Sequence, residues 1–184
     1  MQLTDHRDIA APTATVWAAI LDPDVLKACI PGCESMTGSP EDGFEAVVVQ
    51  KVGPVKARFT GLVQLSDMVA GQSVMISGEG KGGPAGFAKG SARVELAPEG
   101  AGTRLSYTVE ANVGGKLAQL GSRIIDGFAK KMADQFFENF KTALEPPAPD
   151  EGGAAEDGAG DGDADAAETA GEKKKGWFRR ILGR

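Results

Sequence analysis

Hydrophobic and polar residues alternate along three stretches in the middle of the chain, and this alternation predicts β-strands. Side chains at every second position of a strand lie on the same face, so each stretch has one apolar or small-residue face and one polar face. In the three stretches, the apolar or small-residue face comprises, respectively, Val55, Ala57, Phe59, Gly61, Val63 and Leu65; Ala88, Gly90, Ala92, Val94 and Leu96; and Thr103, Leu105, Tyr107, Val109, Ala111 and Val113. Turn signals such as Gly53-Pro54 and Pro98-Glu99-Gly100 separate the stretches, and strands joined by short turns pair antiparallel.

Helical spacing appears at both ends of this strand-rich region. A strand at 3–9 is followed by a short helix that opens at Pro12, and by a second short helix with Asp22 as N-cap and Pro23 at its first position. Near the end, apolar residues recur every three or four positions over about 115–144, namely Leu117, Leu120, Ile124, Phe128, Met132, Phe136, Phe140 and Leu144. We therefore expect an α+β fold, with about seven antiparallel strands curled around a long C-terminal helix.

Small residues are frequent on the inward face of the predicted sheet and on the helix that meets it. The sheet positions are Ala57, Gly61, Ala88, Gly90, Ala92 and Ala111, and the helix positions are Gly121 and Gly127. Protein interiors pack as densely as organic crystals, so small residues on both layers mean either a close approach or a cavity. A curved sheet around one helix cannot close fully, which favours an internal apolar cavity suited to a ligand.

The charge is divided unevenly along the chain. The net charge is −6, but residues 1–145 contribute only about −3, residues 146–172 hold nine acidic residues and no basic one, and residues 173–184 hold six cations. We predict a ligand-binding domain at 1–145, a disordered acidic linker at 146–172 and a basic amphipathic segment at 173–184. The predicted domain has no basic stripe, which disfavours nucleic-acid binding. The polar start of the chain and its two cysteines predict a cytoplasmic protein without a signal peptide.

The basic amphipathic segment has the composition of a peptide that lies on an anionic membrane surface. On a helical wheel its four large apolar side chains fall within one arc, and its cations attract anionic lipid. The residues predicted to contact the membrane are Lys173, Lys174, Lys175, Trp177, Phe178, Arg179, Arg180, Ile181 and Leu182. The alternative is that this peptide docks into a groove on a partner protein.

Gly78–Gly83 matches the dinucleotide-binding pattern G-x-G-x-x-G, but only weakly. That pattern needs a helix after the glycines so that the helix N-terminus faces the phosphates, whereas here another strand is predicted. We interpret the segment as a glycine-rich hairpin that could act as a lid over the mouth of the cavity.

Other motifs give little support for a catalytic or metal site. Cys29 and Cys33 are too few for a zinc site, and His6 is the only histidine, so no metal and no Ser-His-Asp arrangement is predicted. Asp134 is expected on a solvated helix face, together with Glu138. Arg123 lies near the start of the long helix and is either a cavity-mouth residue or an ordinary surface cation.

Several short motifs resemble the family of the carbon monoxide dehydrogenase G subunit over residues 1–144. They are Ala11-Pro12 with Val16-Trp17, Asp22-Pro23, Cys29-Ile30-Pro31-Gly32-Cys33-Glu34, Val52-Gly53-Pro54-Val55, Gly80-Lys81-Gly82-Gly83 with Gly86-Phe87-Ala88, and the run from Gly114 to Arg123. The resemblance implies the helix-grip fold of the START-like superfamily. It also implies a non-catalytic accessory protein that recruits a molybdenum-containing carbon monoxide dehydrogenase, or a related molybdenum hydroxylase, to the inner face of the cytoplasmic membrane.

The resemblance further implies a bound respiratory quinone, menaquinone or ubiquinone, with no covalent cofactor. The residues predicted to bind this hydrophobic ligand are Ile30, Phe59, Phe87, Tyr107, Leu117, Leu120, Ile124, Phe128 and Met132, with Ile30 and Phe87 near the mouth. Two alternatives remain open. One is a pure membrane adaptor whose cavity carries nothing, and the other is an enzyme of the polyketide cyclase type. A shortage of inward titratable residues argues against the enzyme.

Overall fold

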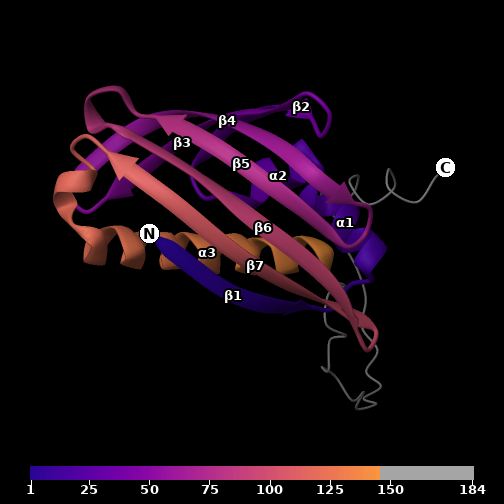
Figure 1. The fold of residues 1–184 in the computed structure, drawn as a ribbon. Coiled ribbons are helices and arrows are strands. Elements are labelled where there is room, and N and C mark those ends of the chain that lie inside the picture. The colour runs from indigo at the N-terminus through magenta and orange to yellow at the C-terminus, as the bar shows by residue number, and fades with distance from the viewer. Residues whose placement is uncertain (146–184) are drawn as a thin grey trace, which may run out of the picture. The chain divides into compact units, whose positions relative to one another are not determined.

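A computed structural model describes residues 1–145 of the 184-residue chain, and these residues form one seven-stranded sheet with three α-helices (Figure 1). The strands are β1 (Gln2–Ile9), β2 (Cys33–Ser39), β3 (Gly43–Val52), β4 (Val55–Val69), β5 (Ser73–Lys81), β6 (Phe87–Glu99) and β7 (Gly102–Gly114). The helices are α1 (Thr13–Ile20), α2 (Pro23–Cys29) and α3 (Ser122–Leu144), with short 3-10 turns η1 (Gly83–Ala85) and η2 (Ala118–Leu120). The predicted α+β class and strand number are confirmed.

The sheet is antiparallel throughout, in the order β1-β7-β6-β5-β4-β3-β2, and it curves around α3 (Figure 1). Along β4 the burial alternates residue by residue from Val55 to Ser66, as the period-two pattern requires. The inner face of the sheet therefore carries the predicted apolar and small side chains, and the outer face carries polar ones.

Two of the three helices begin where the sequence signals place them. The backbone N–H groups of Asp24 and Val25 donate to the Asp22 side chain over 2.8 and 3.3 Å, so Asp22 caps α2 as predicted. The long helix begins later than expected, at Ser122 rather than near Gly115. Gly115 and Gly121 have φ angles of +73° and +86°, a left-handed conformation that interrupts a helix, and η2 fills the segment between them.

The packed core lies toward one end of the sheet. Its most deeply buried members are Phe140, Ile9, Leu105, Val16, Val74 and Cys29. They come from α1, α2, the C-terminal half of α3 and the parts of the strands beneath them. The N-terminal half of α3 contributes no residue to this core, so the other end of the sheet is covered less completely.

The antiparallel order divides the connections between the two ends of the sheet. The β3–β4 turn, the β5–β6 connection and the β7–α3 connection lie at one end, and the other hairpin turns lie at the opposite end (Figure 1). Gly78–Lys81 belongs to β5, and β6 follows η1, so the G-x-G-x-x-G match is a glycine-rich hairpin, as interpreted from the sequence.

The acidic linker at 146–172 and the basic amphipathic segment at 173–184 lie outside the described residues. Within residues 1–145, none of the helices combines the length and apolar character that crossing a bilayer requires.

A candidate ligand cavity between the sheet and helix α3

An apolar compartment of about 280 Å³ lies between α3 and the end of the sheet that the packed core leaves open. We call it the outer compartment. Its large wall residues are Val52 and Phe59 from the sheet, Leu117 before η2, and Ile125 and Phe128 from α3. The sheet opposite is lined by small residues that include Gly80, Ala88 and Ala111. Small side chains on the sheet therefore leave a space that the helix does not fill.

A second apolar compartment of about 420 Å³ lies next to the first, and we call it the inner compartment. Met1, Phe128 and Ala129 line both compartments. Further walls of the inner one come from Ile30, Ala92, Tyr107, Met132, Phe136 and Phe137. Because three residues are shared, the two compartments are adjoining parts of one apolar region between the sheet and α3.

Not every predicted small residue creates space. A Cβ atom added at Gly90 would stand 2.9 Å from the Cβ of Ala111, so this glycine permits close contact within the sheet. Gly121 and Gly127 have no atom within 4 Å of a Cβ position and are exposed. The helix glycines therefore do not line the cavity, and the small residues that do so belong to the sheet and to Ala129 and Ala133 of α3.

Tyr107 places a hydroxyl group among the apolar walls. Its side chain projects from β7, is 6% exposed and stacks on the Phe137 ring with a centroid separation of 5.0 Å. The hydroxyl oxygen is buried and has no hydrogen-bond partner. Burial raises the pKa of Tyr107 above its usual value, so the group is protonated at neutral pH and can donate a hydrogen bond. A buried hydroxyl without a partner costs about 1–3 kcal/mol, and a ligand acceptor would remove that cost.

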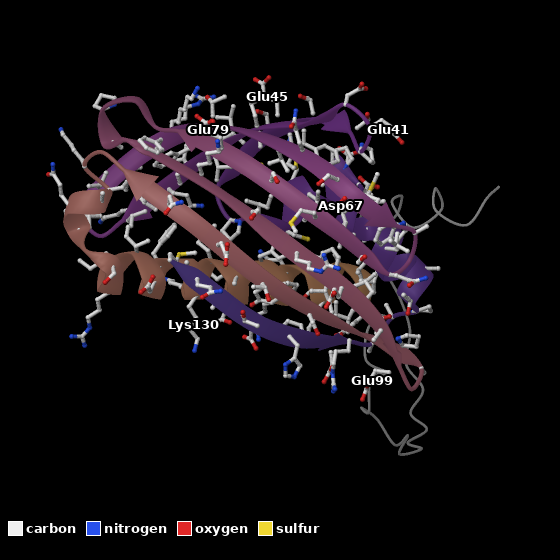
Figure 2. All side chains as sticks on the ribbon, in the orientation of Figure 1. Glu41, Glu45, Asp67, Glu79, Glu99 and Lys130 are labelled. Carbon is white, nitrogen blue, oxygen red and sulfur yellow. The ribbon has the colours of Figure 1, made fainter. Side chains whose placement is uncertain are left out.

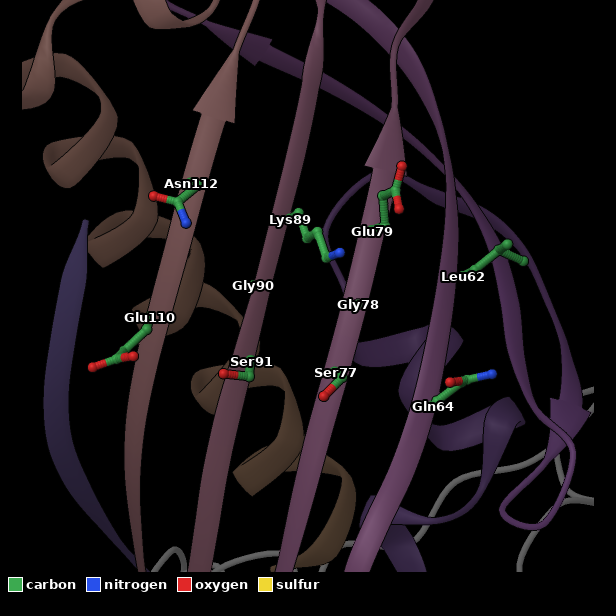
Figure 3. A pocket seen from close by; sticks show the side chains of 10 residues that line it. All are labelled: Leu62, Gln64, Ser77, Gly78, Glu79, Lys89, Gly90, Ser91, Glu110 and Asn112. Atoms are coloured by element: carbon green, nitrogen blue, oxygen red, sulfur yellow. The ribbon is translucent and has the colours of Figure 1, made fainter.

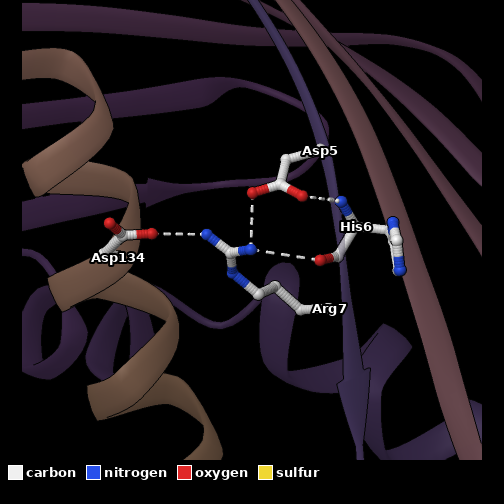
Figure 4. A network of polar contacts seen from close by, with 4 residues as sticks. All are labelled: Asp5, His6, Arg7 and Asp134. Carbon is white, nitrogen blue, oxygen red and sulfur yellow. Dashed lines mark hydrogen bonds and ion pairs between the residues drawn. The ribbon is translucent and has the colours of Figure 1, made fainter. Parts of the chain in front are cut away.

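A charged network borders the same region (Figure 4). Arg7 on β1 contacts the carboxylates of Asp5 and Asp134 over 2.5 Å each, and its guanidinium lies 5.6 Å from the centre of the Phe137 ring. The backbone N–H of His6 donates to Asp5, and this bond together with Arg7 lowers the Asp5 pKa. The network links the edge strand β1 to α3 beside Tyr107, which pairs with Asp5 across the strands.

This network corrects two expectations. Asp134 is half exposed, as a solvated face predicts, but it also binds Arg7. The shortage of inward titratable residues is also wrong at β1, where Asp5 and Arg7 alternate inward with Leu3 and Ile9. The sequence does indicate this placement, because Asp5 and Arg7 occupy the same alternate positions of the strand at 3–9 as the apolar residues Leu3 and Ile9.

Six of the nine predicted ligand-binding residues line the two compartments: Ile30, Phe59, Tyr107, Leu117, Phe128 and Met132. The other three do not. Leu120 and Ile124 lie against the Gly53 turn, and Ile124 is 43% exposed. Phe87 is 47% exposed and its ring packs over Gly114. The late start of α3 explains the misplaced helix residues, because η2 and Gly121 change the direction of the chain before the helix begins.

The remaining candidates do not form a site. Cys29 and Cys33 are free thiols, and burial raises the pKa of both. No cluster of metal-ligating side chains occurs among residues 1–145. A polar hollow of about 540 Å³ lies on the outer face of the sheet, where Glu79, Lys89 and Glu110 surround it (Figure 3). Its mixed polar walls do not suit a long apolar ligand.

An antiparallel sheet wrapped around a long C-terminal helix, with apolar space between them, defines the helix-grip class of proteins. The family model for the carbon monoxide dehydrogenase G subunit (CoxG) matches residues 6–145, and the chain belongs to that family. The resemblance inferred from the sequence motifs is therefore confirmed. Membership supports a role associated with carbon monoxide dehydrogenase, as an accessory or binding protein.

Solved structures share the fold. A conserved protein from Geobacillus kaustophilus is 28% identical, with a TM-score of 0.73, and the match covers 78% of this chain and 95% of that one. A protein from Chromobacterium violaceum (19% identical, TM-score 0.59, covering 79% and 99%) and a putative uncharacterized protein from Rhizobium leguminosarum (18%, 0.62, covering 79% and 94%) support the fold alone. No curated protein matches the chain.

Proposed function

We propose that this protein binds a respiratory quinone between the sheet and α3 and carries it between the membrane and a molybdenum-containing carbon monoxide dehydrogenase. The observation that carries the proposal is the apolar cavity of two adjoining compartments with one buried, unpartnered hydroxyl, that of Tyr107. Family membership supplies the dehydrogenase as the expected partner. The basic amphipathic segment at 173–184 would hold the protein at the cytoplasmic face of the membrane.

The chemistry of the cavity favours a long apolar molecule with a polar atom at one end. The outer compartment is lined almost wholly by carbon and suits an isoprenoid chain. The inner compartment contains the Tyr107 hydroxyl, which can donate to a carbonyl oxygen. A quinone has both parts, whereas a simple hydrocarbon has no acceptor for Tyr107. We therefore place the quinone ring in the inner compartment and its chain in the outer one.

Tyr107→Phe tests this orientation, because it removes one oxygen and leaves the ring that stacks on Phe137. Binding of menaquinone to the purified full-length protein should weaken about 2- to 12-fold, the equivalent of one net hydrogen bond. Binding of squalene, an isoprenoid hydrocarbon without oxygen, should not change. The matched control is Ser106→Ala, which removes a hydroxyl from the neighbouring position on the opposite face of β7.

Two results would contradict the proposal, and they contradict different parts of it. Equal effects of Tyr107→Phe on menaquinone and squalene would contradict hydrogen bonding to the quinone. No uptake of either molecule by the parent protein would remove the carrier function and leave an adaptor that links the dehydrogenase to the membrane.

A further inference from the structure

The two ends of the sheet carry opposite charge. We call the end formed by residues 51–56, 81–87 and 114–124 the η1 end. These three segments contain five cations and no acidic residue: Lys51, Lys56, Lys81, Lys116 and Arg123. The hairpin turns at the opposite end, 39–43, 67–73 and 99–102, contain four acids and no cation. Figure 2 shows three of those acids, Glu41, Asp67 and Glu99, far from the η1 end.

Four of the five cations at the η1 end are available to a partner. Lys51, Lys56, Lys116 and Arg123 form no ion pair with any residue of 1–145, and each is exposed. Only Lys81 is paired, with Glu79 over 3.4 Å. Asp126 lies one turn after Arg123 on α3, but the four unpaired cations still leave this end of the sheet with a net positive surface that attracts an anionic partner.

Exposed apolar side chains lie among these cations. Phe87 begins β6 and Ile124 lies in the first turn of α3 against the Gly53 turn. Both are more than two-fifths exposed, as are Leu62, Met68 and Val69 elsewhere on the sheet, but only Phe87 and Ile124 lie in the segments that carry the five cations. Their chain neighbours Ala88 and Ile125 line the outer compartment, and so does Leu117, next to Lys116. The positive surface thus lies at the end of the sheet that contains the outer compartment.

We propose that the η1 end docks directly on an anionic lipid bilayer, with Phe87 and Ile124 inserted among the headgroups and the four cations against the phosphates. This contact is separate from that of the basic amphipathic segment, and it deepens the proposed carrier function by turning the outer compartment toward the bilayer. Lipid is favoured over an acidic protein surface because isolated apolar side chains surrounded by lysine and arginine match the chemistry of the membrane interface.

The test measures binding of the full chain to vesicles by flotation. To isolate the η1 end, every variant carries the substitutions Lys173→Gln, Lys174→Gln, Lys175→Gln, Arg179→Gln and Arg180→Gln, together with Trp177→Ser, Phe178→Ser, Ile181→Ser and Leu182→Ser, which remove the apolar contacts of the basic amphipathic segment. Vesicles contain phosphatidylcholine alone or with phosphatidylglycerol in equal parts. The background protein should bind only the mixed vesicles, and added salt should weaken the binding.

Each cation contributes about fivefold to binding at an anionic surface. The pair Lys51→Gln/Lys56→Gln, and separately Lys116→Gln/Arg123→Gln, should each weaken binding by roughly 10- to 25-fold. The matched control Lys130→Gln/Lys131→Gln removes the same charge from exposed positions further along α3 and should change binding less than twofold. Phe87→Ser/Ile124→Ser should remove the binding that persists in high salt, and circular dichroism checks that each variant is folded.

Unchanged vesicle binding by the η1-end variants would overturn the proposal, as would an equal loss in the Lys130/Lys131 control. Unchanged vesicle binding with lost capture of the purified dehydrogenase would assign the surface to a protein partner instead. Menaquinone uptake from detergent solution, measured on the same variants, tests the carrier function independently of vesicle binding. A variant that takes up quinone from detergent but does not bind vesicles retains the cavity and lacks only the docking surface.

Discussion

Filling the junction of the two compartments should stabilise the ligand-free protein. Ala129 lies on α3 and lines both compartments, so Ala129→Leu adds three carbon atoms to empty space. At ~0.8 kcal/mol per buried carbon the gain is about 2.4 kcal/mol. Fixing the leucine rotamer takes back about 0.5–1 kcal/mol. We expect a net stabilisation of about 1–2 kcal/mol, which corresponds to a rise of roughly 3–6 °C in Tm.

The assay is urea unfolding of delipidated protein, followed by circular dichroism, with Ala19→Leu as the matched control. Ala19 is also a helical alanine, but it is 5% exposed within the packed core, where an added side chain should destabilise by about 1–3 kcal/mol. Ala129→Leu should also weaken menaquinone binding, because the new side chain occupies the same space. If Ala129→Leu destabilises the protein as much as Ala19→Leu does, the space beside α3 is not available and the reasoning is refuted.

Three further predictions concern the core, the charged network and the thiols. Phe140→Ala should destabilise by about 3–5 kcal/mol in urea unfolding, because Phe140 is fully buried and stacks on Phe136; a loss below about 1 kcal/mol would contradict this packing. The Asp5 pKa is lowered in the folded state, so its contribution is complete above its ordinary value of about 3.9 and is lost as the pH falls through the folded value. Asp5→Asn should therefore be less stable than the parent at pH 7, and a pH series of unfolding curves should show the gap closing in acid; a gap that persists at pH 2 would argue against this linkage. Burial raises the pKa of the Cys29 and Cys33 thiols, so both should react with iodoacetamide more slowly than glutathione does at pH 8. Cys29 is buried and should react more slowly than Cys33, and fast labelling of Cys29 in the folded protein would show that α2 opens.

The sequence predicts the fold well because two strong periodicities determine it. The period of two in 55–65 and 103–113 and the apolar stripe of 122–144 correspond to β4, β7 and α3. The start of α3 is missed because the stripe runs back to Leu117, while the backbone changes direction at Gly121, whose positive φ no hydrophobic pattern encodes. Helix periodicity reports which face is apolar and does not report where the first turn forms.

The cavity is predicted in part. Sheet positions such as Ala88 and Ala111 are found, because residue size and strand parity suffice to place them. The sequence does not predict that Met1, which precedes β1, and Pro31, in the α2–β2 loop, line the cavity. Their positions depend on strand pairing and on the path of the loop, which no local pattern encodes. The Arg7–Asp134 contact joins residues far apart in the chain, and no local pattern indicates it.

The most direct test of quinone carriage is native mass spectrometry of the full-length protein purified from its own host, followed by organic extraction of the bound molecule. We expect a mass increase that corresponds to one quinone per chain, and the extract should contain that quinone. A protein that is empty as purified, and still empty after incubation with quinone-loaded vesicles, would contradict quinone carriage.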